Sequence, residues 1–374
     1  MNKFIFAFLF LPNVLLITIL GFYLPKFSRE NVFFGVKIPY GYKNRNEMLI
    51  LYKKYRRNYA LTILFPLLLY TYFFIFGNVI SIIKLSVLFI FIIAFAMEIN
   101  YYFIYKEVLK IKHNSDWVLG KRQVTVVNLK RRDHVKNYPS KYWFIIPAFI
   151  VILSLIMMIE RYHYLPERIP LHYNINNEVD RWGEKSFLTF LPLQLTQIGL
   201  IILMFFIFNL IKKSKMNLNI LKPEKSEYQN NLIKSNLAYL IILLTIMQQI
   251  IFFIINMNML MLIDVKLMTI WLTVLTALTI MIIIIYIIKS YHIYNESKDS
   301  LSVDNQQIID RDDEKYWIAG MFYYNPDDPS LLIEKRVGIG WDFNYAKPMA
   351  KIIAVLAALI IIGSILLVWF IPLE

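Results

Sequence analysis

Residues 266–288 read KLMTIWLTVLTALTIMIIIIYII, a run with no charged side chain after Lys266. A helix needs about 20 apolar residues to cross roughly 30 Å of hydrocarbon, and this run is long enough. Inside a bilayer every backbone N–H and C=O must be bonded within the segment, so a single run that crosses it has to be helical. The stretch therefore predicts a transmembrane helix.

Similar apolar runs recur along the 374 residues, near 4–24, 58–77, 79–104, 142–160, 187–211, 237–257 and 349–371. Only Gly77 and Asn78 indicate a turn between the second and third runs. We interpret the first run as a retained helix, because bulky residues follow it and no small-residue cleavage site is present. Together the runs predict an all-α polytopic membrane protein with about eight transmembrane helices.

Composition supports a lipid environment and argues against nucleic acid as a partner. Apolar residues make up 58% of the chain and charged residues 18%, against about 25% charged in ordinary soluble domains. The formal charge of +14 is carried mainly by the connections at 25–57, 105–141, 212–236 and 289–348. Basic connections stay in the cytoplasm, so we expect both termini outside. The absence of cysteine excludes disulfides and thiol chemistry.

These runs divide the chain into five regions. We predict an N-terminal transmembrane region of three helices at 1–141, a helix pair with an extracellular loop at 142–212, a second helix pair at 213–288, a cytoplasmic module at 289–348 and a C-terminal helix at 349–374.

The loop between the fourth and fifth spans begins LPERIPLHYN at residues 165–174. Pro166 and Pro170 forbid a regular helix, so we expect a stiff, extended start. Asn176 and Asn177 should supply a turn. Candidate ligand-binding or structural residues of this loop are Pro166, Pro170, His172, Asn174, Asp180, Trp182 and Lys185.

This loop resembles a domain of unknown function found in SdpI-like bacterial membrane proteins. The pattern Leu-Pro, Ile-Pro, His, Asn, then Asp, Trp and Lys falls on Leu165, Pro166, Ile169, Pro170, His172, Asn174, Asp180, Trp182 and Lys185. The family usually has Gly in the turn after Asn174, where this chain has Asn177, Glu178 and Val179.

Two further segments are similar to the longer branch of that family, which carries a second small domain near its C-terminus. They are residues 34–39 and the stretch that contains Trp317, Gly320, Tyr323, Tyr324, Asn325, Asp327, Asp328, Pro329, Lys335, Arg336, Gly338, Gly340, Trp341 and Asn344. The resemblance implies a bacterial plasma membrane protein that confers immunity to a peptide toxin or senses the envelope, with an extracellular peptide and a cytoplasmic regulator as partners.

The outer loop also contains residue types that bind metals. His163, His172, Glu178 and Asp180 could ligate zinc, but no pair has helical ligand spacing and no HExxH motif exists. We therefore expect structural hydrogen bonds, no metal and no cofactor. A rigid surface that recognises peptides, with Trp182 as its anchor, fits the same residues.

Polar residues inside the spans support an alternative function. Glu98 lies toward the cytoplasmic end of the third span, where an ionisable group is a functional candidate. With Gln194, Gln197, Gln248 and Gln249 it could serve a transporter or a membrane-embedded enzyme, although interhelical hydrogen bonds are the simpler role for the glutamines. Asn256, at the outer end of its span, is expected to meet water.

The cytoplasmic module should contain a β-hairpin. Residues 316–324 and 331–336 are predicted as its strands, on either side of a Pro/Asp turn. We expect Trp317, Tyr324 and Trp341 to cluster, and Asp327 and Asp328 to bond backbone amides. Further candidate residues are Asn325 and Arg336. No motif for catalysis is evident, so a non-enzymatic sensor is the main hypothesis.

Overall fold

The computed structural model describes residues 14–115, 117, 122–124, 137–174, 177–214, 218–295, 308–338 and 340–370. Six helices in this part of the chain are long and apolar enough to cross a membrane. They are α2 (Asn46–Phe76), α3 (Val79–His113), α4 (Ile145–Tyr162), α5 (Phe187–Lys213), α6 (Pro223–Met259) and α7 (Val265–Asn295). Their number and apolar character confirm an all-α polytopic membrane protein.

Two shorter apolar helical segments lie where the first and last spans were expected. They are Val14–Lys26 and the apolar part of α8 (Pro348–Phe370). The expected residues 4–13 and 371 lie outside the described residues. The predicted break between α2 and α3 is confirmed, because the Asn78 side chain accepts a hydrogen bond from the Ser81 amide at 2.8 Å and so caps α3.

Several helices are longer than their apolar runs. α2 begins at Asn46, α3 continues to His113 and α6 begins at Pro223. The added turns contain lysines and glutamates, which are good helix formers in water. Lys54 and Glu107 join the extensions of α2 and α3 through an ion pair of 2.6 Å.

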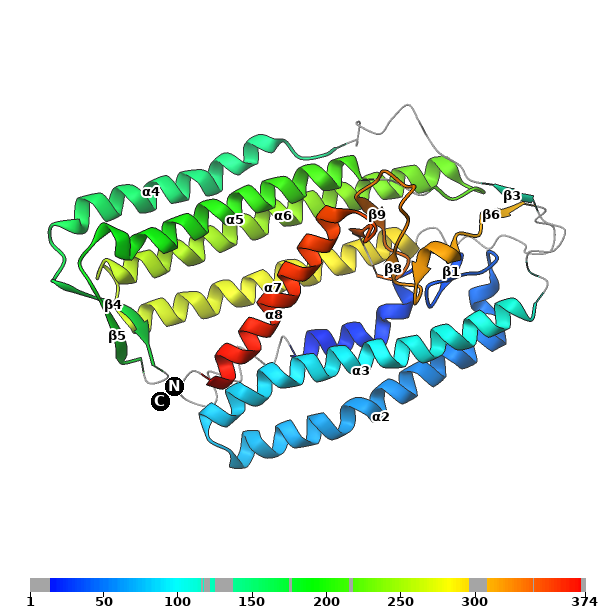
Figure 1. Cartoon of the computed structure of the whole chain (residues 1–374), viewed down its shortest axis with the longest axis horizontal. Coiled ribbons are helices and arrows are strands. Elements are labelled where there is room, and N and C mark those ends of the chain that lie inside the picture. Colours follow the sequence, from blue (N-terminus) through cyan, green and yellow to red (C-terminus); the bar gives the residue numbers. More distant parts are fainter. Residues whose placement is uncertain are drawn as a thin grey trace.

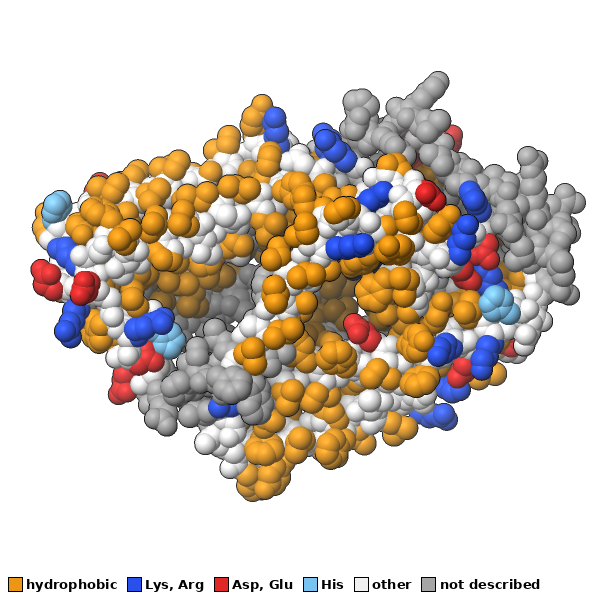
Figure 2. Space-filling model, in the orientation of Figure 1, with side chains coloured by type: hydrophobic (Ala, Val, Ile, Leu, Met, Phe, Trp, Pro, Cys, Tyr) orange, Lys and Arg blue, Asp and Glu red, His pale blue; other side chains and the backbone are white. Residues whose placement is uncertain are grey.

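Helices α2 to α7 run roughly along the long axis of the molecule, and α8 crosses obliquely to them (Figure 1). α4, α5, α6 and α7 pack side by side, α2 and α3 form a separate antiparallel pair, and α8 contacts α3. Apolar side chains cover the middle of the visible face, whereas most charged side chains gather toward its two ends (Figure 2). This distribution is typical of a membrane protein whose helices are surrounded by hydrocarbon around their middle.

Short β-hairpins lie at both ends of the helices. At one end β4 (Arg168–Tyr173) pairs with β5 (Val179–Glu184). At the other end are β1 (Val32–Phe33) with β2 (Val36–Lys37), and a parallel pair, β3 (Arg122–Val124) with β6 (Ile308–Asp310). The last two pairs were not expected from the sequence, because two- and three-residue strands carry almost no pattern.

The predicted strand pairing is wrong in the segment before α8, residues 308–345, which we call the C-terminal module. Residues 316–324 and 331–336 do not pair with each other. The first segment folds back on itself, and the second pairs with residues 341–343. β7 (Trp317–Ile318) pairs with β8 (Phe322–Tyr323), and β9 (Leu332–Glu334) pairs with β10 (Trp341–Phe343), both antiparallel. The chain reverses early because Ala319 and Gly320 both adopt positive φ.

The expected aromatic cluster is also wrong. Trp317 packs on Tyr323, with ring centroids 5.1 Å apart, while Tyr324 is exposed. Successive side chains of a strand point to opposite faces, so only one of the two tyrosines can join Trp317. Trp341 packs instead with residues of α5 and α6, including Phe208 and Ile241.

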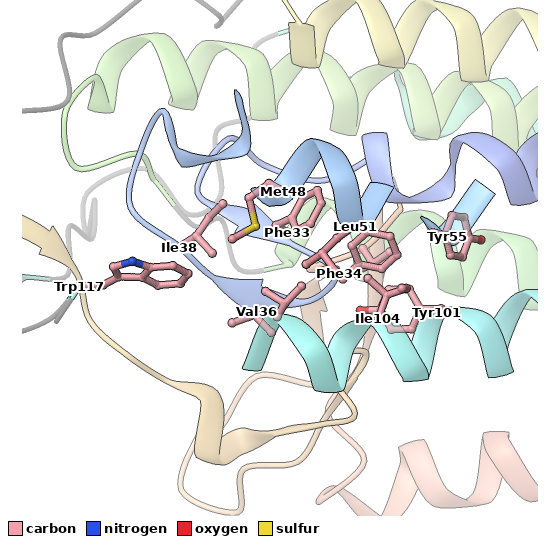
Figure 3. Close-up of a cluster of buried hydrophobic side chains, with 12 residues drawn as sticks. Phe33, Phe34, Val36, Ile38, Met48, Leu51, Tyr55, Tyr101, Ile104 and Trp117 are labelled. Carbon is pink, nitrogen blue, oxygen red and sulfur yellow. The ribbon is translucent and has the colours of Figure 1, made fainter. Parts of the chain in front are cut away.

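A hydrophobic core joins the segment after the first helix to α2 and α3. Phe33, Phe34, Val36 and Ile38 pack there with Met48, Leu51, Tyr55, Tyr101, Ile104 and Trp117 (Figure 3). Val337, from the C-terminal module, belongs to the same core. Residues about 300 positions apart in sequence therefore share one packed unit.

Candidate functional site

The β4–β5 hairpin is the main candidate site. Its two strands pair antiparallel, whereas the sequence predicted only an extended start and a turn. Pro170 lies opposite Trp182 and His172 opposite Arg181, with irregular register on both sides of His172. Asn177 adopts a left-handed φ of 64°. Asparagine tolerates this conformation better than other non-glycine residues, which explains how the chain turns here without a glycine.

The hairpin is anchored to the ends of α4 and α5. The Lys185 ammonium donates to the carbonyl oxygens of Leu165 at 2.8 Å and His163 at 3.3 Å. Tyr162 stacks on Phe187 with ring centroids 4.0 Å apart. Below them a buried cluster contains Met158, Leu165, Ile169, Phe190 and Leu260. Lys185 is thus a positioning residue, as are Leu165 and Ile169.

The outer face of the hairpin is polar and exposed. His172 Nδ1 lies 2.7 Å from an Asp180 carboxylate oxygen. The Asn174 side chain bonds both the Glu178 carboxylate and the Glu178 amide, at 3.0 and 2.9 Å. Trp182 is 49% exposed. Pro166 lies between the end of α4 and the start of β4, outside both elements. The structure therefore brings all seven predicted loop residues into one hairpin and its base.

The geometry offers little for metal chemistry. Among the described residues no group of three or more His, Asp or Glu side chains could hold a metal ion. His172 and Asp180 make a single hydrogen-bonded pair, and the Glu178 carboxylate is engaged by Asn174. The hairpin surface is suited to recognition by hydrogen bonds and an aromatic anchor.

The structure does not bring Glu98 and the glutamines together. Glu98 is exposed on α3, and its neighbour Asn100 faces α2, where it donates to Thr62 at 3.1 Å. Gln194, Gln197 and Gln249 are buried between α4, α5 and α6, with Gln248 partly buried beside them. Asn256, expected to meet water, is fully buried instead because its amide bonds the Ser154 carbonyl on α4.

The C-terminal module is fastened to the rest of the molecule through Arg336. Its guanidinium is buried, donates to the Gly35 carbonyl at 2.7 Å and to the Asp313 carboxylate, and lies 4.7 Å from the Trp317 ring centroid. Glu314 is 3.8 Å away. Arg336 thus links this module to the segment after the first helix.

Sequence reasoning missed the partners of Arg336. Lys37 bonds Asp313 at 2.8 Å, and Lys112 bonds Asp312 and Glu314 at 2.9 and 3.0 Å. Burial would raise the pKa of Asp313, but the charges of Arg336 and Lys37 lower that pKa well below its usual range. The sequence feature that could have indicated these partners is a run of three consecutive acidic residues, 312–314, in an otherwise basic chain.

Asn325 and Asp328 organise the turn of the module. Asn325 Oδ1 accepts from the Asp327 amide at 3.0 Å, and Asp328 Oδ1 accepts from the Ser330 amide at 2.9 Å. Asp328 also accepts from the Tyr323 hydroxyl at 3.2 Å. Burial raises the pKa of Tyr323 to about 12, so this phenol remains a donor at neutral pH.

Comparison with family models matches two parts of the chain. A domain of unknown function, DUF1648, matches residues 149–196, which run from α4 through the hairpin into α5. A family of unknown function, DUF5808, matches residues 326–351, from the module into α8. Both are typical of membrane protein families. Comparisons with curated proteins and with solved structures gave no match.

Proposed function

We propose that this chain is a non-enzymatic membrane sensor or immunity protein of the SdpI-like type, in which the β4–β5 hairpin receives an extracellular peptide. The observation that carries the proposal is an exposed two-stranded sheet on a rigid base. In the described part of the chain no third strand pairs with β4 or β5. An extended peptide can add to such an edge through main-chain hydrogen bonds.

The composition of the two strands selects β5 as the receiving edge. Pro170 in β4 has no N–H group, which makes β4 a poor template. β5 contains no proline, and its exposed Asp180, Arg181 and Trp182 can contact the side chains of a bound peptide. The Trp182 ring supplies apolar surface for a side chain of the peptide. The charges of Asp180 and Arg181 favour peptides with complementary charges.

The second half of the proposal assigns a reporting role to the module at residues 308–345. It lies at the opposite end of the helices from the hairpin (Figure 1). If the hairpin is outside, the module faces the cytoplasm, where a regulator can bind it. Transport or membrane catalysis through Glu98 has less support, because Glu98 does not share the buried site of the glutamines.

A toxin-sensitivity assay tests the proposal. Bacteria that produce wild type, Trp182→Ala or Asp180→Ala are exposed to the peptide fraction of supernatants from competing strains. Both variants should lose protection, because each removes a side chain of the receiving edge. Tyr164→Ala is the matched control, since Tyr164 is more exposed than Trp182 but lies outside both strands. Equal protection by all four proteins at equal membrane levels would contradict the proposal.

A further inference from the structure

A cluster of buried polar side chains lies between α4, α5 and α6. Ser154, Gln194, Gln197, Gln249 and Asn256 are each no more than 3% exposed. Gln194 and Gln197 are one turn apart on the same face of α5, and Gln249 and Asn256 are two turns apart on the same face of α6. This polar cluster is therefore a continuous strip inside the transmembrane helices.

Hydrogen bonds orient the amides of this polar cluster. Asn256 Nδ2 donates to the backbone carbonyl of Ser154, and Gln249 Nε2 donates to that of Gln197, both at 3.2 Å. A carbonyl only accepts, so these bonds require the amide nitrogens to face them. The carboxamide oxygens of Gln249 and Asn256 consequently point away from these contacts.

These oxygens have no partner among the described residues. The same holds for the side-chain oxygens of Gln194 and Gln248 and for both polar atoms of Gln197. Within the polar cluster four carboxamide oxygens therefore lack a partner, against one nitrogen, that of Gln197. A bilayer interior provides no water to satisfy them, so acceptors left empty there are costly. A ligand that satisfies these oxygens must be a hydrogen-bond donor or a cation.

The chemistry of the polar cluster limits the charge of that occupant. Its side chains are carboxamides and one hydroxyl, with no carboxylate to balance a divalent ion such as Ca²⁺. An anion would be repelled by the four carboxamide oxygens that lack a partner. Hard oxygen ligands without net charge are suited to a monovalent cation that keeps part of its water.

We propose that the polar cluster is a hydrated binding site for a monovalent metal cation, entered from the hairpin end. Asn256 lies in the last turn of α6, and α6 contacts β4 of the hairpin. The outermost oxygens of the polar cluster are thus directly below the hairpin. The proposal is independent of peptide recognition, because it uses none of the exposed hairpin residues.

The absence of cysteine from the natural chain allows a direct accessibility test. Ser154→Cys replaces a hydroxyl by a thiol of similar shape, and Ile152→Cys places a thiol at nearly the same depth of α4 on its 52% exposed, lipid-facing side. Each full-length protein is held in lipid nanodiscs and treated with Ag⁺. Thiols that remain are then counted by maleimide labelling after denaturation.

Ag⁺ should block Ser154→Cys at least about tenfold faster than Ile152→Cys, because a thiol needs water to form its reactive thiolate. Excess K⁺ should slow this reaction, whereas the same concentration of N-methylglucamine should not. An anionic methanethiosulfonate should leave Ser154→Cys unmodified. Equal Ag⁺ rates at positions 152 and 154, or equal modification by the anionic reagent, would overturn the proposal.

A measurement on the wild-type protein avoids any effect of substitution. Its melting temperature in KCl should exceed that in N-methylglucamine chloride at the same ionic strength, because a bound ion stabilises the folded state. Gln249→Leu should abolish the difference, and Leu195→Gln, which adds an amide to the exposed face of α5, should preserve it. The same melting temperature of wild type in both salts would overturn the proposal.

Discussion

Gly35 and Gly320 meet backbone to backbone, and their contact joins the segment after the first helix to the C-terminal module. A Cβ atom on Gly35 would lie 2.4 Å from the Gly320 carbonyl oxygen and equally close to the Tyr101 hydroxyl. Both glycines have positive φ, 76° and 70°. Two independent constraints, space and backbone conformation, therefore require glycine at these positions.

Gly35→Ala should weaken the docking of the module. Alanine at positive φ costs on the order of 1 kcal/mol, and the clash with a backbone carbonyl must add to that cost. We expect a lower melting temperature and faster proteolysis within residues 308–345. Gly199→Ala is the control, because nothing lies within 4 Å of its new Cβ, and its helical position should gain about 0.5–1 kcal/mol. Equal effects of the two substitutions would contradict the contact.

Asp313→Asn should change how stability depends on pH. The folded pKa of Asp313 is below its ordinary value of about 3.9, so its carboxylate stabilises the fold above about pH 4 and loses this effect as the pH falls through the folded pKa. Melting temperatures between pH 7 and pH 3 should fall for wild type and fall less for the variant.

At neutral pH the same substitution should destabilise the protein. The loss should be smaller than the about 3–5 kcal/mol for a buried ion without any partner, because Glu314 remains 3.8 Å from Arg336. Asp327→Asn, in the exposed turn, should keep the wild-type pH profile. A wild-type profile for Asp313→Asn would show that the Arg336 contact contributes no stability.

The turn of the hairpin should accept glycine and reject a β-branched residue. Asn177→Gly relieves the left-handed conformation and also restores the residue that the resembling family prefers there. Asn177→Val should cost roughly 1–2 kcal/mol because its Cβ clashes at positive φ. The melting temperature in detergent checks both, and a valine variant as stable as wild type would refute this turn conformation.

Labelling of intact cells checks the orientation. Because the chain lacks cysteine, Leu171→Cys and Asp327→Cys each create a unique thiol at an exposed position. A membrane-impermeant maleimide should label Leu171→Cys in intact cells and Asp327→Cys only after permeabilisation. Labelling of both in intact cells would place the hairpin and the module on one side and remove the proposed division of roles.

The amino-acid sequence by itself determined the fold class, and it predicted an extended start and a turn in the outer loop. Apolar runs as long as 266–288 leave the backbone no alternative to a helix, because the hydrocarbon offers no other hydrogen-bond partner. Pro166, Pro170 and the asparagine pair at 176–177 likewise predict an extended strand and a turn locally. These signals depend only on residues that are close together in the sequence, so the sequence contains them in full.

Only the tertiary structure decided which distant residues meet. The contact of Arg336 with Gly35 and Asp313, the burial of Asn256 and the separation of Glu98 from the glutamines all depend on which helix faces are turned together. An all-apolar helix has no polar face to indicate that choice. Two- and three-residue strands such as β7 and β8 are similarly set by glycine conformations and packing, for which the local pattern carries too little information.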